Sequence, residues 1–136
     1  MKLRRLSGLT LAVFFIVVAF AASDCCALDI LIDVSPNVLN IQSASTIVTV
    51  HTDIAYSLVV GASVHLNGVD IAWWKSDDRG NFVAKFDSDD VKTLDGLKIG
   101  DYNTLTLIGF TTGGESFIGQ QDIMVIDVTP VGAGGK

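Results

Sequence analysis

Cysteine is nearly absent from this chain of 136 residues: Cys25 and Cys26 are the only two, and they are adjacent. Neighbouring cysteines bridge each other only with backbone strain, so the pair is a poor structural staple. From residue 28 onward there is no cysteine, and the fold there depends on its hydrophobic core. About 109 residues can bury roughly 65% of their unfolded surface, which is enough for one domain.

Basic residues are also few, with 9 Lys and Arg against 15 Asp and Glu and a formal net charge of −6. Three of these cations lie within the first five residues, so residues 28–136 are more acidic than the whole chain. This balance argues against binding to nucleic acid or to anionic lipid. The length leaves no room for a catalytic domain beside a binding domain, and internal repeats and coiled-coil heptads are absent.

The N-terminus is typical of an export signal. A basic start precedes the apolar run 9–20, and the small residues 21–23 offer cleavage-site chemistry. Cuts after residue 21, 23 or 27 all fit, the last two being favoured, so residues 1–27 are predicted to be a signal peptide. The alternative is a retained anchor, although a bilayer-spanning helix needs about 20 apolar residues. We therefore expect a secreted, periplasmic or cell-surface protein.

From residue 28 the dominant period is two, which is typical of half-buried β-strands. Strands are predicted over 28–34 (with a short extension at 38–41), 46–51, 63–66, 69–75, 81–86, 102–110, 116–119 and 122–128. About seven or eight short strands separated by turns predict an all-β protein, an antiparallel β-sandwich of immunoglobulin-like architecture over residues 28–128. Residues 129–136 form a Gly-rich tail that is flexible in composition.

Three local patterns add detail to this prediction. Asn67-Gly68 between alternating segments predicts a hairpin turn, because both residues tolerate positive φ. Segment 88–94 opens with an N-cap residue and first-turn acids, and it predicts one helical turn or short helix. The alternation in 81–86 places three side chains inward: Phe82, Ala84 and Phe86.

Segment 32–43, which reads Ile-Asp-Val-Ser-Pro-Asn-Val-Leu-Asn-Ile-Gln-Ser, resembles the opening of a group of exported prokaryotic immunoglobulin-like modules. The likeness continues in order through 63–68, 78–86, 111–119 and 125–127. It implies an extracytoplasmic sandwich of undefined role, often embedded in larger surface proteins. Such relatives often carry a longer Asp/Gly-rich loop where this chain has only residues 76–81, which argues against a calcium role here.

Catalytic patterns are scarce as well. His51 and His65 are the only histidines, and each alternates with inward apolar neighbours, so both are expected on outward faces and make a weak zinc site. No Gly-x-Ser-x-Gly motif favours a catalytic triad, although a triad assembled in space stays open. Phosphate-binding glycine loops are absent too. We expect a protein that is not an enzyme and needs no cofactor.

Acidic and amide side chains gather in one predicted loop, at Asp77, Asp78 and Asn81. Oxygen ligands at such short spacing are of the kind that holds Ca²⁺. However, no Asp-x-Asp-x-Asp-Gly loop accompanies them. Solvated turn residues are therefore the favoured interpretation, and no metal is expected.

Trp73 and Trp74 are the candidates for contact with a partner. Neighbours in a strand point to opposite faces. If Trp73 joins Val69 and Ile71 in the core, Trp74 projects outward and becomes the candidate partner-contact residue, since exposed tryptophans often contact proteins or sugars. The alternative is that a loop or the N-terminal extension covers it.

The expected function is a secreted or cell-surface, non-catalytic binding or structural module whose partner is an unidentified protein or glycan. No nucleic-acid partner is expected, and membrane contact is expected only through an uncleaved signal segment. Two alternatives stay open. One is a self-assembling envelope or filament subunit, a homo-oligomer that uses strand addition through segment 122–128. The other is a small secreted carbohydrate-binding module or enzyme.

Overall fold

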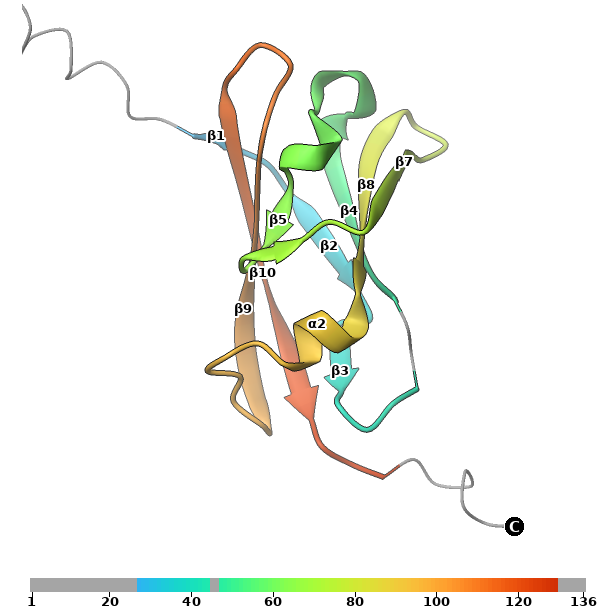
Figure 1. Cartoon of the computed structure of the whole chain (residues 1–136), viewed down its shortest axis with the longest axis vertical. Helices are drawn as coiled ribbons and strands as arrows, with labels where there is room; N and C mark the ends of the chain where they lie inside the picture. The colour runs from blue at the N-terminus through green and yellow to red at the C-terminus, as the bar shows by residue number, and fades with distance from the viewer. Residues whose placement is uncertain (1–26, 45–46, 130–136) are drawn as a thin grey trace, which may run out of the picture.

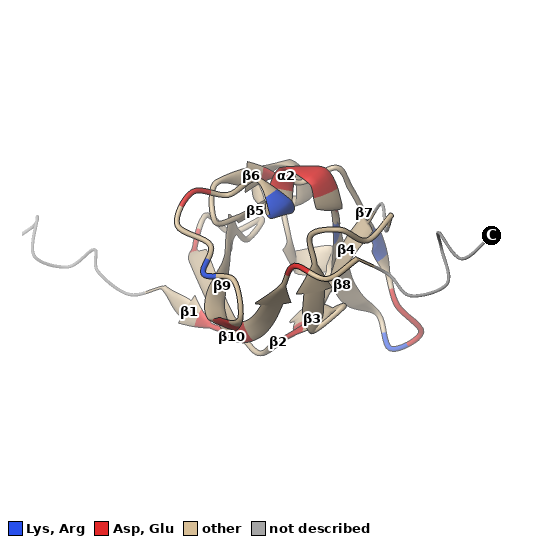
Figure 2. Ribbon diagram, turned by 90° about the horizontal axis from the view of Figure 1, so that it is seen from below, with Lys and Arg blue, Asp and Glu red and all other residues tan. Residues whose placement is uncertain are grey.

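The computed structural model describes residues 27–44 and 47–129, which form two β-sheets that face each other (Figures 1 and 2). The prediction of an all-β sandwich is confirmed. Residues 1–26 of the predicted signal peptide, which include the Cys25-Cys26 pair, and most of the predicted tail lie outside the described residues. Within the described ranges, no helix is long and apolar enough to cross a membrane.

The larger sheet, sheet A, has the strand order β1-β10-β9-β5-β6, and β3 also pairs with β10. Its strands are β1 (Leu28–Asp29), β3 (Val38–Asn40), β5 (His65–Leu66), β6 (Val69–Asp70), β9 (Asp101–Phe110) and β10 (Ser116–Ile126). The smaller sheet, sheet B, has the order β2-β4-β8-β7. Its strands are β2 (Ile32–Ser35), β4 (Ile47–Ala55), β7 (Trp73–Ser76) and β8 (Asn81–Asp87). Two 3₁₀ turns, η1 (Tyr56–Leu58) and η2 (Gly61–Ser63), connect β4 to β5.

The core lies between the sheets and consists largely of the residues that alternation places inward. Phe82, Ala84 and Phe86 of β8 are fully buried, which confirms the prediction for that strand. They share one hydrophobic cluster with Leu105 and Leu107 of β9. Burying a side chain of this size contributes about 1.5–3 kcal/mol relative to leaving it in water.

Two predicted strands each divide between the sheets, a feature that the sequence pattern does not reveal. Segment 28–34 begins as β1, which pairs with β10 in sheet A, and continues as β2, which pairs with β4 in sheet B. Segment 69–75 begins as β6 in sheet A and continues as β7 in sheet B. In the opposite sense, the predicted strands 116–119 and 122–128 merge into the single strand β10.

Polar side chains secure the first of these crossings. The Leu31 N–H donates to Oδ1 of Asp53 at 2.9 Å, and the Leu31 carbonyl accepts from the Asp53 N–H at 3.2 Å. The Val34 N–H, on the edge strand of sheet B, donates to Oε1 of Gln121 on β10 at 2.7 Å. These contacts supply partners for backbone groups at the place where the chain changes sheets.

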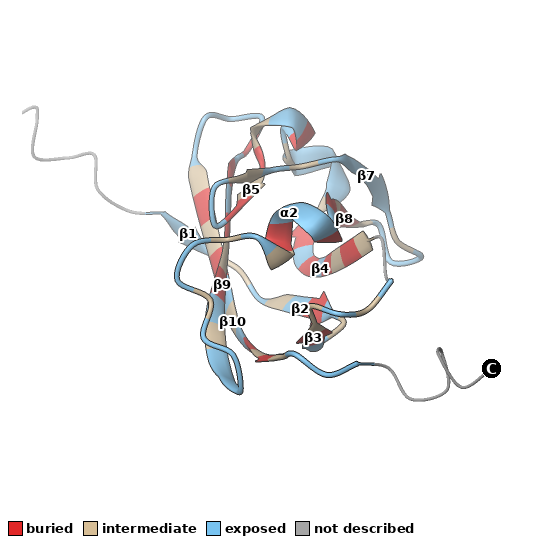
Figure 3. Ribbon diagram, turned by 60° about the horizontal axis from the view of Figure 1, so that its bottom comes forward, coloured by how far each residue is buried: buried red, intermediate tan, exposed pale blue. Residues whose placement is uncertain are grey.

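The predicted turn and helix are both present. Asn67 and Gly68 have φ values of 48° and 84°, and they join β5 to β6 as a hairpin. Helix α2 (Ser88–Lys92) begins after Asp87, whose Oδ1 accepts from the Asp89 N–H at 2.9 Å. Asp87, not Ser88, is therefore the N-cap. Because Val91 is fully buried in the core cluster, α2 covers the lower opening between the sheets (Figure 3).

The link between the sheets through Gln121 predicts an asymmetry between two neighbouring glutamines. Gln121→Met removes the acceptor of the Val34 N–H while keeping the shape of the side chain, and it should lower the free energy of unfolding by about 1–3 kcal/mol. Gln120→Met, on the exposed outer face of the same strand, should change it by less than about 0.5 kcal/mol. Urea unfolding of both variants makes the comparison, and equal effects would contradict the role assigned to Gln121.

Candidate functional site

The outer face of sheet A carries exposed apolar side chains at the end near η1 and η2. On β9, Ile108 and Phe110 are 47% and 52% exposed, while Leu107 between the sheets is fully buried. Ile118 of β10 lies directly opposite Ile108. The Val60 N–H donates to the Phe110 carbonyl at 3.0 Å, which places Val60 beside Phe110.

Val59 packs against the core, whereas its neighbours Leu58 and Val60 lie beside the end of β9, where the Leu58 carbonyl accepts from the Thr112 N–H at 2.9 Å. They are 50% and 42% exposed. The apolar group of sheet A is defined here as Leu58, Val60, Ile108, Phe110 and Ile118. Sequence analysis missed it, although a signal is present: the apolar alternation of β9 changes phase between Leu107 and Ile108.

Gly109 occupies the inward position of β9 between two outward side chains, Ile108 and Phe110. Its inward position is filled by another residue, because a Cβ placed on Gly109 would lie 2.6 Å from Cζ of Phe117. The ring of Phe117 therefore supplies the core at this point of β9. Ile108 and Phe110, on either side of the glycine, remain on the outer face.

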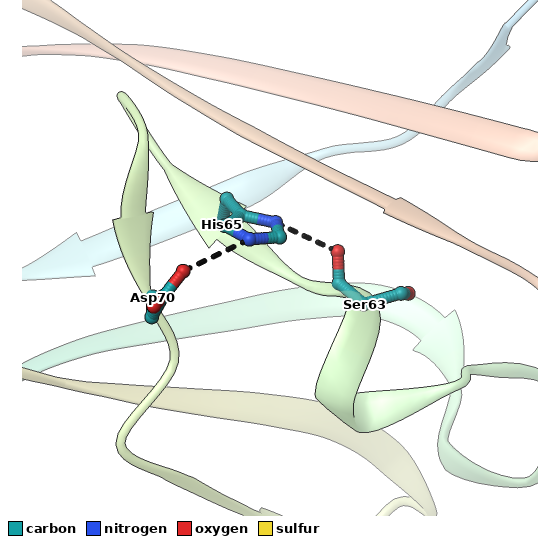
Figure 4. Close-up of polar contacts among 3 residues, drawn as sticks. All are labelled: Ser63, His65 and Asp70. Carbon is teal, nitrogen blue, oxygen red and sulfur yellow. Dashed lines mark hydrogen bonds and ion pairs between the residues drawn. The ribbon is translucent and has the colours of Figure 1, made fainter.

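His65 borders the apolar group, lying between Ile108 on β9 and Asp70 on β6. Its Nε2 is 3.0 Å from Oδ1 of Asp70, and its Nδ1 is 2.9 Å from the carbonyl oxygen of Ser63 (Figure 4). Both ring nitrogens of His65 thus face oxygen atoms. The Asp70 side chain is 90% exposed, so solvent screens this pair strongly.

Ser63, His65 and Asp70 have the composition of a catalytic triad but not its geometry. In a triad the imidazole lies between the carboxylate and the serine hydroxyl. Here the Ser63 hydroxyl donates to the Val60 carbonyl at 2.6 Å and accepts from the Phe110 N–H at 2.9 Å. The cluster therefore ties η2, β5 and β6 to β9. His51, which is exposed, lies on sheet B, so both histidines occupy outer faces as predicted but do not converge.

The calcium candidates Asp77, Asp78 and Asn81 lie at the turn between β7 and β8. Oδ1 of Asp77 accepts from two backbone N–H groups, those of Arg79 at 2.8 Å and Asn81 at 2.9 Å. Among the residues that the structure describes, no group of three or more His, Cys, Asp or Glu side chains is arranged to hold a metal ion. Asp77 organises the turn.

The same contacts lower the pKa of the Asp77 carboxyl below its usual value. The largest cause is the hydrogen bond from the Asn81 backbone; desolvation acts in the opposite direction, and the Arg79 backbone and the charges of His51 and Arg79 lower the pKa further. A carboxyl with a lowered pKa stabilises the fold above its unfolded-state pKa, and this stabilisation is lost as the pH falls through the folded-state pKa.

Asp77→Asn should therefore reveal a pH-dependent loss of stability. The variant keeps an oxygen acceptor but removes the charge, so it should melt at a lower temperature than the parent chain near neutral pH. The difference should shrink as the pH falls through the acidic range in which Asp77 titrates. Thermal melts across that range provide the measurement, and a difference that stays constant with pH would count against this assignment.

Both tryptophans differ from the prediction. Trp74 lies opposite the buried Ala84, on the inner face of sheet B, whereas Trp73 lies opposite Lys85 on the outer face. The expectation that Trp73 enters the core with Val69 and Ile71 is wrong, and Trp73 is 48% exposed. The reason is the crossing from β6 to β7, since alternation counted in sheet A does not carry over into sheet B.

Trp74 closes one side of the sandwich. A Cβ placed on Gly61 of η2 would lie 2.1 Å from Cε2 of Trp74, so the indole occupies the space that a side chain would need there. This contact joins edge strand β7 to the segment that leads into sheet A. Trp74 remains 38% exposed. Its predicted role in partner contact falls on a side chain that also packs against the fold.

The contact predicts that Gly61 and Trp74 are energetically coupled. Gly61→Ala should destabilise the chain by about 1–3 kcal/mol, because the added methyl group overlaps the indole. In a Trp74→Ala background the same substitution should cost less than about 0.5 kcal/mol. A double-mutant cycle by chemical unfolding measures the coupling. An unchanged cost of Gly61→Ala in both backgrounds would sink this account of the closure.

Segment 122–128, the candidate for strand addition, is not a free edge. Its residues Asp122–Ile126 belong to β10, which pairs with β9 on one side and with β3 on the other. Within the described residues this segment therefore offers no fully unpaired edge for strand addition. Among the described strands of sheet B, β7 is an edge.

Comparison with protein-family models, with curated proteins and with solved structures finds no match for this chain.

Proposed function

We propose that the chain is an exported, immunoglobulin-like, non-catalytic module that binds a protein partner at the cell surface through the apolar group of sheet A. The observation that carries the proposal is the exposure of that group. A single exposed apolar side chain is ordinary on a protein surface, but a contiguous set is typical of an interaction site.

The arrangement suits a binding surface in two further respects. Ile108, Phe110 and Ile118 stand on long paired strands, so binding would order little backbone, which lowers its entropic cost. Beyond them, Gln120 donates to Oγ1 of Thr106 at 3.1 Å and Thr104 donates to Asp122 at 2.6 Å. An apolar centre next to a polar rim is the common anatomy of protein interfaces.

Export and the immunoglobulin-like assignment belong to the same proposal. The basic start, apolar run and small residues of 1–27 support export. The resemblance of segment 32–43 and the packing of two sheets support the immunoglobulin-like assignment. A partner outside the cytoplasm fits both.

Site-specific photo-crosslinking in producing cells tests the proposal. A photoreactive residue at position 110 should yield one discrete adduct with another protein, whereas the same residue at position 51, on the outer face of sheet B, should not. Replacing Ile108 by Thr, which keeps strand propensity, should lower the yield from position 110 about tenfold. Absence of an adduct at position 110 would overturn the proposed surface, and an adduct with a second copy of this chain would favour self-assembly.

A further inference from the structure

The outer face of sheet B, on the opposite side of the sandwich, combines an exposed aromatic ring with lysines. Trp73 on β7 lies directly opposite Lys85 on β8, and Lys75 follows two residues later on the same face. The intervening residues Trp74 and Ala84 face inward. The three outward side chains therefore stand together on two paired strands.

The indole of Trp73 has an ordered neighbour. Nζ of Lys85 lies 5.4 Å from the ring centroid and also donates to Oγ1 of Thr49 at 2.9 Å. The ammonium group is thus held by a hydroxyl on β4 and by the face of the ring. Despite this contact, 48% of Trp73 remains exposed. The exposed part of the Trp73 indole is therefore a flat apolar surface, and the Lys85 side chain beside it is held in place.

The β7–β8 hairpin is richer in cations than the rest of the chain, whose formal net charge is −6, and Asp77, Asp78 and Asp87 balance its three cations in number. Of the five Lys and Arg residues that the structure describes, three are Lys75, Arg79 and Lys85 (Figure 2). Within the described part of the chain, none of these three has a carboxylate oxygen within 4.0 Å. Cations without an ion-pair partner beside an exposed ring favour an anionic ligand.

Asp87 follows Lys85 on the same face of β8, but among the described residues no carboxylate forms an ion pair with Lys75 or Lys85. Asp77 and Asp78 lie in the turn beyond Ser76, where Oδ1 of Asp77 accepts from backbone N–H groups. Asp33 is on the same face but opposite His51, at the far side of the sheet. Among the described residues, neither Lys75 nor Lys85 is therefore engaged in an ion pair, and Lys85 is positioned by Thr49 and the indole.

Two classes of polyanion have rings that stack on an indole. In duplex nucleic acid the base faces are stacked on one another, so only an unpaired base could stack on the indole, and proteins that bind single strands usually follow the backbone with a basic groove. In an acidic polysaccharide the sugar rings are not stacked on one another, so the C–H face of a ring is available to lie against the flat apolar indole. The few cations and the single ring fit the second class better.

We propose that Trp73, Lys75 and Lys85 form a binding site for an acidic polysaccharide. The indole stacks on one sugar ring, and the two ammonium groups pair with carboxylates or sulfates on that ring and the next. The site is separate from the apolar group of sheet A. A variant of one surface should therefore leave the other intact.

Binding of polygalacturonate to the full chain, followed by tryptophan fluorescence and affinity electrophoresis, tests the proposal, with heparin as a sulfated probe. At least one of the two should bind, and added salt should weaken the complex. Trp73→Ala should weaken binding about tenfold or more, and Lys75→Gln combined with Lys85→Gln should reduce both affinity and salt dependence. Neutral dextran should bind far more weakly.

Matched controls keep the outcome interpretable. Tyr102→Ala removes an exposed aromatic residue from sheet A, and Lys98→Gln removes a cation outside the hairpin; both should bind like the parent chain. Trp73→Phe keeps an aromatic ring at this position. If Trp73→Phe retains part of the polysaccharide binding that Trp73→Ala loses, the loss comes from the missing ring and not from unfolding. Ile108→Thr should retain polysaccharide binding even if the proposed protein partner is lost.

Three results would overturn the inference. They are no binding of polygalacturonate or heparin, equal binding by the parent chain and the Trp73→Ala variant, and tighter binding of single-stranded DNA than of either polysaccharide. The last result would assign the surface to nucleic acid instead.

Discussion

Packing of β8 against the β9–β10 hairpin holds this molecule together. With no cysteine after residue 26, the two sheets depend on the buried side chains between them. Phe82 and Phe86 from sheet B and Phe117 from sheet A are the largest of these. Because the inner faces carry the stability, the outer faces are left with fewer structural constraints. The two proposed binding surfaces both lie there.

The sides of the sandwich need their own closures, and each uses a different contact. Gln121 of β10 reaches the Val34 N–H on β2, and Asp53 pairs with Leu31 where the N-terminal segment changes sheets. On the opposite side, the Trp74 indole fills the space over Gly61. Each closure occurs near a crossing of the chain between sheets. The crossings are therefore supported by specific contacts as well as by strand pairing.

Much of the fold is predictable from sequence because its signals are local. Asn67-Gly68 predicts its hairpin through backbone preference, and the alternation of Phe82 and Phe86 predicts the inner face of β8. The crossings are not predictable in this way, since alternation says which face a residue takes but not which sheet the strand joins. Strands are paired by contacts distant in sequence.

The same limit explains the error at the tryptophans. Alternation counted forward from Val69 places Trp73 inward, but that count crosses from sheet A to sheet B. Counting back from Ala84 across the turn pairs it with Trp74 and gives the observed orientation. Asp77 is different, because its interpretation as a turn residue uses only local sequence information. In the structure its carboxylate accepts hydrogen bonds from two backbone N–H groups of that turn.

The central claim is that the outer face of sheet A is free in the isolated chain and occupied at the cell surface. Hydroxyl-radical footprinting of the purified protein and of producing cells tests it directly. In the purified protein Phe110 should be oxidised readily while Phe82 and Phe117 are protected. On cells, oxidation of Phe110 should fall to the level of the buried rings. Equal oxidation of Phe110 in both samples would contradict the account.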